Sequence, residues 1–186
     1  MKKLTHDQIS ENRSTLETIH KVSKLPVYVL LDSIRSSYNV GSIFRTSDGV
    51  MIEKLFLCGY TPYPPNSLHS GRKEILKTAL GSTESVKWEY VKDPHEIILK
   101  LKKDGVKICA LELTNKSKKY YESCSKDFPL CLIVGNEISG VSQSLIDLCD
   151  FSIEIPQYGI KQSLNVAVAY GIAVFELRKI FDQKTN

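Results

Sequence analysis

Short, strand-like apolar runs alternate with helix-like stretches along most of this chain. Six runs are rich in apolar and β-branched residues: 27–34, 54–60, 86–91, 106–113, 130–136 and 151–156. Five other stretches favour helix, at 39–48, 74–81, 94–104, 142–149 and 163–183. Such alternation is typical of α/β proteins, in which helices flank a mostly parallel sheet. With 186 residues, the chain has the size of one such domain.

The first 25 residues stand outside this alternation. Ile9, Leu16, Ile19 and Val22 have helical spacing within residues 6–22, and Pro26 closes the segment. We therefore expect an N-terminal helical extension over residues 1–25 and one domain over residues 26–186. Within that domain, residues 61–70 form a proline-rich loop, which is either a lid or a connector.

Composition and missing motifs exclude several classes of protein. The N-terminus lacks the apolar core of a secretion signal, and no stretch has the roughly 18 apolar residues of a membrane span. The five cysteines form no C-x-x-C pair, which favours a reducing, cytoplasmic location. No nucleotide-binding glycine motif occurs, and the four histidines have no metal-ligand spacing. We expect no membrane association and no metal. A net charge of +4 permits an anionic partner.

Three strand ends are followed by unusual polar residues, and ligands of parallel sheets bind at such ends. After the first strand, SSYNVGSIFRTSDG places Asn39, Ser42 and Arg45 on one helix face, opposite an apolar face. In LCLIVGNEISGVS, a strand stops at Gly135, Asn136 and Glu137 before a helix that begins at Ser142. These strand ends are the candidate site.

The third strand end leads into a helix that is apolar almost all round. Pro156 ends the strand, Ser163 is a natural N-cap, and Asn165 falls in the first helical turn. A helix of this composition must be covered on every side, by its own sheet and by a second subunit. Burial of Asn165 there is costly unless the side chain has a partner.

In this order, the three stretches resemble the motifs of the SpoU (TrmH-like) family of RNA 2′-O-ribose methyltransferases, in the SPOUT superfamily. The matching stretches run from Asn39 to Gly49, over VGNEISGVS, and from Ile155 to Ile172. The segment KTALGSTESVKWEY also looks like the family's linker, so the resemblance covers about residues 27–175. Gln157 and Tyr170 depart from the usual pattern, and neither departure removes a catalytic group.

The resemblance implies a SPOUT methyltransferase domain over residues 26–186 with a deep C-terminal trefoil knot. It also implies S-adenosylmethionine as cofactor, an RNA substrate, and a homodimer formed through the knot region. Many relatives carry an extra RNA-binding domain, for which the first 25 residues are too few. This favours tRNA over rRNA and leaves RNA binding to the dimer and its basic N-terminal segment.

The family motifs also imply roles for single residues. The cofactor would contact Gly135, Asn136, Ile155, Leu164 and Asn165, with Leu111 as a weaker candidate. Glycine at 135 and the loop 156–163 would let the backbone approach the ligand closely. The reacting ribose would be surrounded by Asn39, Arg45, Glu137, Ser163 and Asn165. Arg45 would be central, either as the base or as a fixed positive charge that stabilises the alkoxide.

Simpler interpretations stay open. Arg45 alone is an ordinary surface arginine paired with Glu137, Glu137 alone is a structural residue that orients Arg45 or Asn39, and Ser163 alone is an N-cap. The whole chain also fits a non-catalytic RNA-binding or assembly protein with the SPOUT fold. A third alternative is an α/β enzyme that acts on a small nucleotide.

Overall fold

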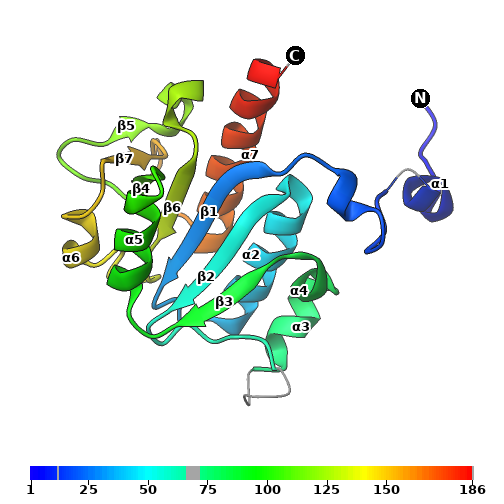
Figure 1. Ribbon diagram of the computed structural model, residues 1–186, viewed down its shortest axis with the longest axis horizontal. Helices are drawn as coiled ribbons and strands as arrows, with labels where there is room; N and C mark the ends of the chain where they lie inside the picture. The colour runs from blue at the N-terminus through cyan, green and yellow to red at the C-terminus, as the bar shows by residue number, and fades with distance from the viewer. Residues whose placement is uncertain (12, 66–71, 186) are drawn as a thin grey trace.

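The computed structural model describes residues 1–11, 13–65 and 72–185, and its fold is α/β (Figure 1). Across these residues, seven strands form one parallel sheet in the order β3-β2-β1-β6-β4-β7-β5. The strands are β1 (Leu25–Asp32), β2 (Ile52–Cys58), β3 (Trp88–Val91), β4 (Lys107–Leu111), β5 (Lys118–Lys119), β6 (Leu130–Val134) and β7 (Phe151–Glu154). The parallel α/β architecture expected from the alternation is confirmed.

The helices follow the predicted stretches closely. They are α1 (His6–Glu11), α2 (Ser37–Val50), α3 (Glu74–Ala79), α4 (Ser82–Ser85), α5 (Pro94–Lys103), α6 (Gln143–Ile146) and α7 (Val166–Thr185). The described residues also form the short 3₁₀ helices η1 (Ile19–Lys21), η2 (Tyr120–Glu122) and η3 (Ser125–Asp127). The two-residue β5 was not predicted, because two lysines carry no strand signal.

The N-terminal segment corrects one expectation. A continuous helix over residues 6–22 is wrong, because the described residues of this stretch form only the short helices α1 and η1. Ile9, Leu16 and Val22 are 44%, 61% and 38% exposed, so their apolar spacing packs against no core. A short helix without tertiary packing is marginal in water. The first strand begins at Leu25, next to the expected boundary at residues 25–26.

Helices cover both faces of the sheet. On one face, Val29 and Leu31 of β1 join a core with Phe44 of α2 and Val174 of α7. On the other face, Leu30 lies in a second core with residues of α5 and α6. β1 is therefore apolar on both sides, as buried parallel strands are. Residues 66–70 of the proline-rich loop lie outside the described part of the chain.

The strand order places the three candidate strand ends at one edge of the sheet. β6 lies between β1 and β4, so the strand order reverses next to β1. Crevices at such reversals are the usual ligand sites of open parallel sheets. The chain segments that follow β1, β6 and β7 meet at this edge.

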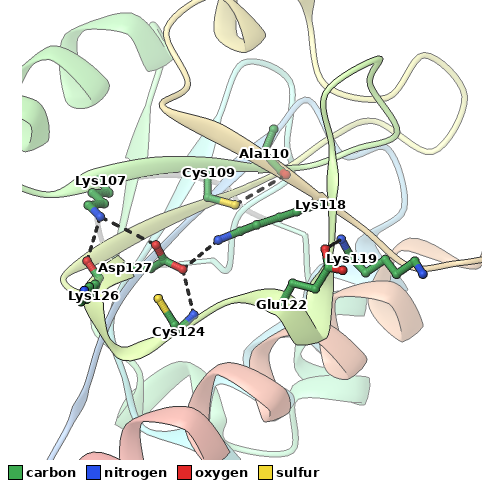
Figure 2. A network of polar contacts seen from close by, with 9 residues as sticks. All are labelled: Lys107, Cys109, Ala110, Lys118, Lys119, Glu122, Cys124, Lys126 and Asp127. Carbon is green, nitrogen blue, oxygen red and sulfur yellow. Dashed lines mark hydrogen bonds and ion pairs between the residues drawn. The ribbon is translucent and has the colours of Figure 1, made fainter.

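A buried carboxylate holds the outer strands together (Figure 2). Asp127 accepts hydrogen bonds from the Cys124 N–H and the Lys118 Nζ, each at 2.9 Å, and Lys107 Nζ lies 3.7 Å away. Burial raises the pKa of Asp127, but these donors and cations outweigh it, and the net pKa is lowered. The network fixes β5 and η3 to the start of β4.

Within the described ranges, no helix combines the length and the apolar character needed to cross a membrane. The same residues hold no cluster of three or more histidine, cysteine or acidic side chains suited to a metal ion.

Candidate active site

A pocket of about 660 Å³ opens beyond the carboxyl ends of β4, β6 and β7. Its walls come from the end of β4, the turn after β6, the loop after β7 and the start of α7. Five of the six residues predicted to contact the cofactor line it: Leu111, Gly135, Asn136, Ile155 and Leu164. Apolar walls combined with a few converging polar groups are typical of a small-molecule site.

The turn after β6 is held rigidly by its own asparagine. Asn136 donates from Nδ2 to the Ser33 carbonyl at 2.7 Å, and its Oδ1 accepts from the N–H groups of Ile138 and Ser139. Its backbone pairs in both directions with Gly140. Every polar atom of this side chain therefore serves to shape the turn.

Gly135 is required for a different reason than we expected. A Cβ placed there would lie 2.1 Å from the Val141 nitrogen and 2.2 Å from the Gly140 carbonyl carbon. The space of the missing side chain is filled by the chain's own backbone and not left for a ligand. This glycine allows the turn to fold back onto β6.

Two carboxylates at strand ends anchor the same turn, and sequence reasoning missed both. Glu112 accepts from the Val141 N–H at 2.9 Å, and Asp32 accepts from the Ser142 N–H at 3.0 Å. Each residue is the acidic end of an otherwise apolar strand-like run. A lone carboxylate at the end of a buried strand is the signal that would have found them.

Glu137 joins the turn to the start of α2. Its carboxylate accepts from the Arg35 N–H at 2.8 Å, the Ser36 N–H at 3.0 Å and the Asn39 Nδ2 at 2.8 Å. Burial raises the pKa of Glu137, but these donors outweigh it, and the net pKa is lowered. The carboxylate thus orients Asn39, and it binds these three donors in place of the alternative ion pair with Arg45.

Asn39 in turn binds Asn165, which links the third loop. Because Glu137 accepts from Asn39 Nδ2, the Asn39 Oδ1 is left as an acceptor, and Asn165 Nδ2 donates to it at 3.1 Å. Asn165 Oδ1 accepts from the Ala167 and Val168 N–H groups at 2.9 and 3.4 Å. The donors and acceptors along Glu137, Asn39 and Asn165 are consistent throughout.

These contacts correct the start of the last helix. α7 begins at Val166, and Asn165, which was expected inside the first turn, is its N-cap. Ser163 was expected to cap the helix, but it lies earlier in the loop and lines the pocket. Asn165 is exposed in the single chain and does not line the pocket itself, although it lies at the end of the loop that does.

Arg45 lies apart from the other predicted catalytic residues. It is exposed on α2, while Ile43 and Phe44 beside it are fully buried, so the two-faced helix is confirmed. Six residues separate it from Asn39, which is about 9 Å along the helix axis. Within one chain, Asn39, Glu137 and Asn165 are brought into contact, Ser163 lies in the pocket wall, and Arg45 does not reach the pocket.

The exposed face of α7 lies beside this part of α2. A Cβ on Gly49 would lie 3.8 Å from the Phe175 ring, and one on Gly171 would lie 3.9 Å from the Thr46 methyl. Tyr170 is fully buried and binds the Ser47 hydroxyl at 2.7 Å. Val168 and Phe175 are 51% and 54% exposed, so the sheet covers only one side of this apolar helix.

Comparison with known proteins agrees with this geometry. Residues 26–175 match the SpoU rRNA Methylase family. A tRNA (guanosine(18)-2′-O)-methyltransferase of Aquifex aeolicus is 33% identical over 170 residues, which cover 90% of this chain and 75% of that protein. Staphylococcal relatives match over only about 58% of their own length.

Solved structures give the same result. The A. aeolicus TrmH/SpoU tRNA modifying enzyme superposes with a TM-score of 0.77 at 29% identity, covering 91% of this chain and 84% of that chain. An AdoMet-bound rRNA methyltransferase from Sinorhizobium meliloti superposes with a TM-score of 0.72 at 29% identity, covering 87% of this chain and 59% of the other.

Proposed function

This chain belongs to the SpoU rRNA methylase family, and from that membership and its pocket we propose that it transfers a methyl group from S-adenosylmethionine to a ribose 2′-hydroxyl of RNA. The observation that carries the proposal is the hydrogen-bonded series Glu137–Asn39–Asn165, which joins all three motif loops at the pocket. We favour tRNA over rRNA, because the relative matched over 75% of its length acts on tRNA. The reaction would take place in the cytoplasm.

The pocket fits S-adenosylmethionine in size and chemistry. Leu111, Ile155 and Leu164 offer apolar walls for the adenine, and the backbone of the turn around Gly135 and Asn136 offers polar groups at its rim. When bound, the cofactor supplies a methyl group on a positively charged sulfonium. The carboxylate of Glu137 also lines this pocket and is negatively charged at neutral pH.

The residues of the chain would align and activate the ribose. Asn39 and Asn165 position it at the pocket rim, with Ser163 as a further hydrogen-bonding group, because alignment provides much of the rate enhancement when the leaving group is good. The 2′-oxygen gains the methyl group and loses its proton to an RNA phosphate or to water. Arg45 is a poor base, since arginine keeps its proton up to a pH above about 12. We assign it the fixed positive charge that stabilises the developing alkoxide.

We also propose a homodimer formed through α7. α7 exposes Val168 and Phe175, and the loop after β7 exposes Ile160, so water contacts these apolar side chains in the single chain. A second copy that covered these side chains would bring another chain beside α2, where Arg45 lies. Sedimentation equilibrium should give twice the mass of one chain, and a monomer would contradict this part of the proposal.

The trefoil knot is part of the same proposal. β7 lies between β4 and β5, so the connection over residues 112–117 passes across the end of β7. Thr114 binds Ser152 at 2.7 Å, and Ser117 donates to the Glu154 carboxylate, which keeps this connection close to β7. We infer that the C-terminal segment leaves β7 through this loop. Tracing the chain in a crystal structure would check the threading.

The decisive experiment is methyl transfer by an Arg45→Ala variant. Tritiated cofactor is incubated with the protein and total tRNA or total rRNA, and the gained methyl is mapped by mass spectrometry. We expect transfer to be abolished in Arg45→Ala, while calorimetry shows cofactor affinity within a few fold of wild type. Arg45→Lys keeps the charge but loses the planar fork, and should recover part of the activity.

Controls separate the alternatives. Lys87→Ala removes an exposed cation that directly precedes β3, the outermost strand next to β2. This variant should leave methyl transfer unchanged. Near-normal turnover by Arg45→Ala would contradict the assignment of this residue. Failure of the wild type to bind S-adenosylmethionine would favour a non-catalytic RNA-binding protein. Activity that survives nuclease digestion of the RNA would favour an enzyme of small nucleotides.

A further inference from the structure

A second pocket, of about 360 Å³, opens at the same edge of the sheet, beyond the ends of β1, β2 and β3. Neither the motifs nor the proposed chemistry uses it. Its walls include Arg35, Ser37, Tyr60, Tyr63, Arg72 and Tyr90. The pocket therefore combines two guanidinium groups with three phenol rings.

The described walls of this pocket are fixed by hydrogen bonds. Thr61 is almost fully buried, and its hydroxyl donates to the Leu31 carbonyl at 3.1 Å and accepts from the Ile34 N–H at 3.0 Å. The Tyr90 hydroxyl donates to the Gly59 carbonyl at 2.8 Å. These bonds tie the segment after β2 to both neighbouring strands, so they fix the shape of this side of the pocket.

The aromatic side chains offer surfaces for a flat ring. Tyr63 and Tyr90 pack together with ring centroids 4.7 Å apart, tilted by 48°, and form one wall. Tyr60 is 78% exposed next to them. Exposed aromatic rings in basic grooves are typical stacking sites for the bases of single-stranded nucleic acid.

The charged side chains of the pocket favour a ligand that carries both an anionic group and hydrogen-bond donors. Arg35 and Arg72 are exposed, and neither is in an ion pair with any of the described residues. Guanidinium groups bind phosphate oxygens in a planar, two-point geometry. Glu74, the one carboxylate in the described wall, can accept from a hydroxyl or a base amino group. A nucleotide unit satisfies all of these groups.

The two pockets share a structural element. Glu137, which lines the first pocket, accepts from the Arg35 and Ser36 N–H groups. The next residue, Ser37, lines the second pocket together with Arg35. Successive residues are about 3.8 Å apart, so the start of α2 separates the pockets by only a short distance. A strand of RNA with its reacting ribose near Asn39 has its neighbouring nucleotide within reach of the second pocket.

We propose that the second pocket binds the nucleotide next to the methylated one. Arg35 and Arg72 hold its phosphate, and Tyr60 stacks on its base. This subsite rests on the proposed RNA methylation, and it would make the sequence around the target part of what the protein recognises. It also gives the domain that holds the first pocket a contact with RNA beyond the reacting ribose.

The test is RNA binding by the double variant Arg35→Ala/Arg72→Ala, with bulk tRNA and bulk rRNA as probes. Binding to these probes is measurable whether or not the chain methylates them. We expect the dissociation constant to rise about tenfold or more. The slope of log affinity against log salt should become shallower by about 0.7 for each phosphate that the variant no longer neutralises. S-adenosylmethionine affinity, measured by calorimetry, should stay within twofold.

Matched variants separate the subsite from general charge. Lys87→Ala/Lys103→Ala also removes two exposed cations, away from the pocket, and should change binding less than twofold. Tyr60→Ala should weaken binding about fivefold or more and leave the salt slope unchanged, because stacking releases no counterions. Ultraviolet cross-linking should attach RNA to a peptide that contains Tyr60 or Tyr63.

The outcomes distinguish this proposal from the one on which it rests. Wild-type binding and salt slope in the arginine double variant would overturn the subsite, even if the wild type methylates RNA. Loss of RNA binding in that variant, with no methylation by the wild type, would support an RNA site and overturn the proposed methyl transfer. Equal losses in the double variant and its lysine control would also overturn the subsite.

Discussion

The two loops that line the first pocket, beyond the ends of β6 and β7, are held in very different ways. The turn over residues 135–142 is anchored by Asn136, Glu137, Glu112 and Asp32 to three neighbouring segments. The loop over residues 155–164 is mostly exposed, with Ile160 fully so. Within the described structure, its one side-chain hydrogen bond runs from Gln157 to the nearby Ile155 carbonyl.

This difference assigns separate tasks to the two walls. The turn over residues 135–142 is held in place by hydrogen bonds to other parts of the chain itself. The loop over residues 155–164 exposes large apolar side chains. Burial of these side chains stabilises the protein only when a ligand or a second chain covers them. Loops with few internal contacts also open at low free-energy cost. We infer that the turn fixes the position of the cofactor and that the loop closes over it.

The largest expected difference in stability between the turn and the loop comes from a glycine-to-alanine substitution in each of them. Gly135→Ala forces a methyl group into backbone atoms about 2 Å away, and we expect it to lower the free energy of unfolding by about 3 kcal/mol. Gly159→Ala has no atom within 4 Å of the new Cβ, and its cost should stay below about 0.5 kcal/mol. Urea denaturation measures both values.

Cofactor titration of the same pair sharpens the comparison. Calorimetry should show at least a tenfold loss of S-adenosylmethionine affinity in Gly135→Ala and less than a twofold change in Gly159→Ala. Equal stabilities in the two variants would show that the turn is no more constrained than the loop, which would remove the basis of the comparison.

A smaller effect is expected for Glu137→Gln. The glutamine amide has one acceptor oxygen in place of two, so at least one of the three donors loses its partner. We expect a loss of about 2 kcal/mol of stability and a larger loss of methyl transfer, because Asn39 is no longer oriented. Glu84→Gln, at an exposed position, is the control and should cost less than about 0.5 kcal/mol.

The pH dependence of this variant tests the same contacts. The pKa of Glu137 is lower in the folded chain than its ordinary value of 4.5, so its charged form stabilises the fold. That stabilisation is complete above pH 4.5 and is lost as the pH falls through the lower, folded-state pKa. The difference in stability between wild type and Glu137→Gln should therefore shrink below pH 4.5. A gap that does not change with pH would contradict the assignment.

The position of the turn over residues 135–142 was largely predictable from the sequence, for a physical reason. Parallel strands place their carboxyl ends at one edge, so polar residues after several strands must meet there. The pattern of strands and polar residues therefore places Gly135, Asn136 and Glu137 at the pocket. The roles of Asp32 and Glu112 were missed, because their partners are backbone N–H groups of a turn more than 25 residues away.

The loop over residues 155–164 and the start of α7 were predicted less well. Ser163 and Asn165 are both good N-cap residues, and local preference does not choose between them. The bond from Asn165 to Asn39, across 126 residues, accompanies the choice of Asn165. The prediction of a helix over residues 6–22 was wrong for a related reason, because its apolar side chains have no surface to pack against. Contacts distant in sequence decide such cases, and spacing alone does not contain them.

The smallest expected effect on stability comes from variants that distinguish the two roles of Asn165. The residue caps α7 and also donates a hydrogen bond to Asn39. Asn165→Ala removes the N-cap of α7 and should cost about 1 kcal/mol in urea denaturation. Asn165→Asp keeps an N-cap acceptor and adds a favourable negative charge at the helix start, so its stability should be within about 0.5 kcal/mol of wild type. It still loses the donor to Asn39 Oδ1 and places a carboxylate against that oxygen.

If the link between the walls serves catalysis, Asn165→Asp should lose methyl transfer about as severely as Asn165→Ala while it remains nearly as stable as wild type. Full turnover by Asn165→Asp would mean that Asn165 acts only as a helix cap. The two walls would then close independently, and the alignment of the ribose would depend on Asn39 and Glu137 alone.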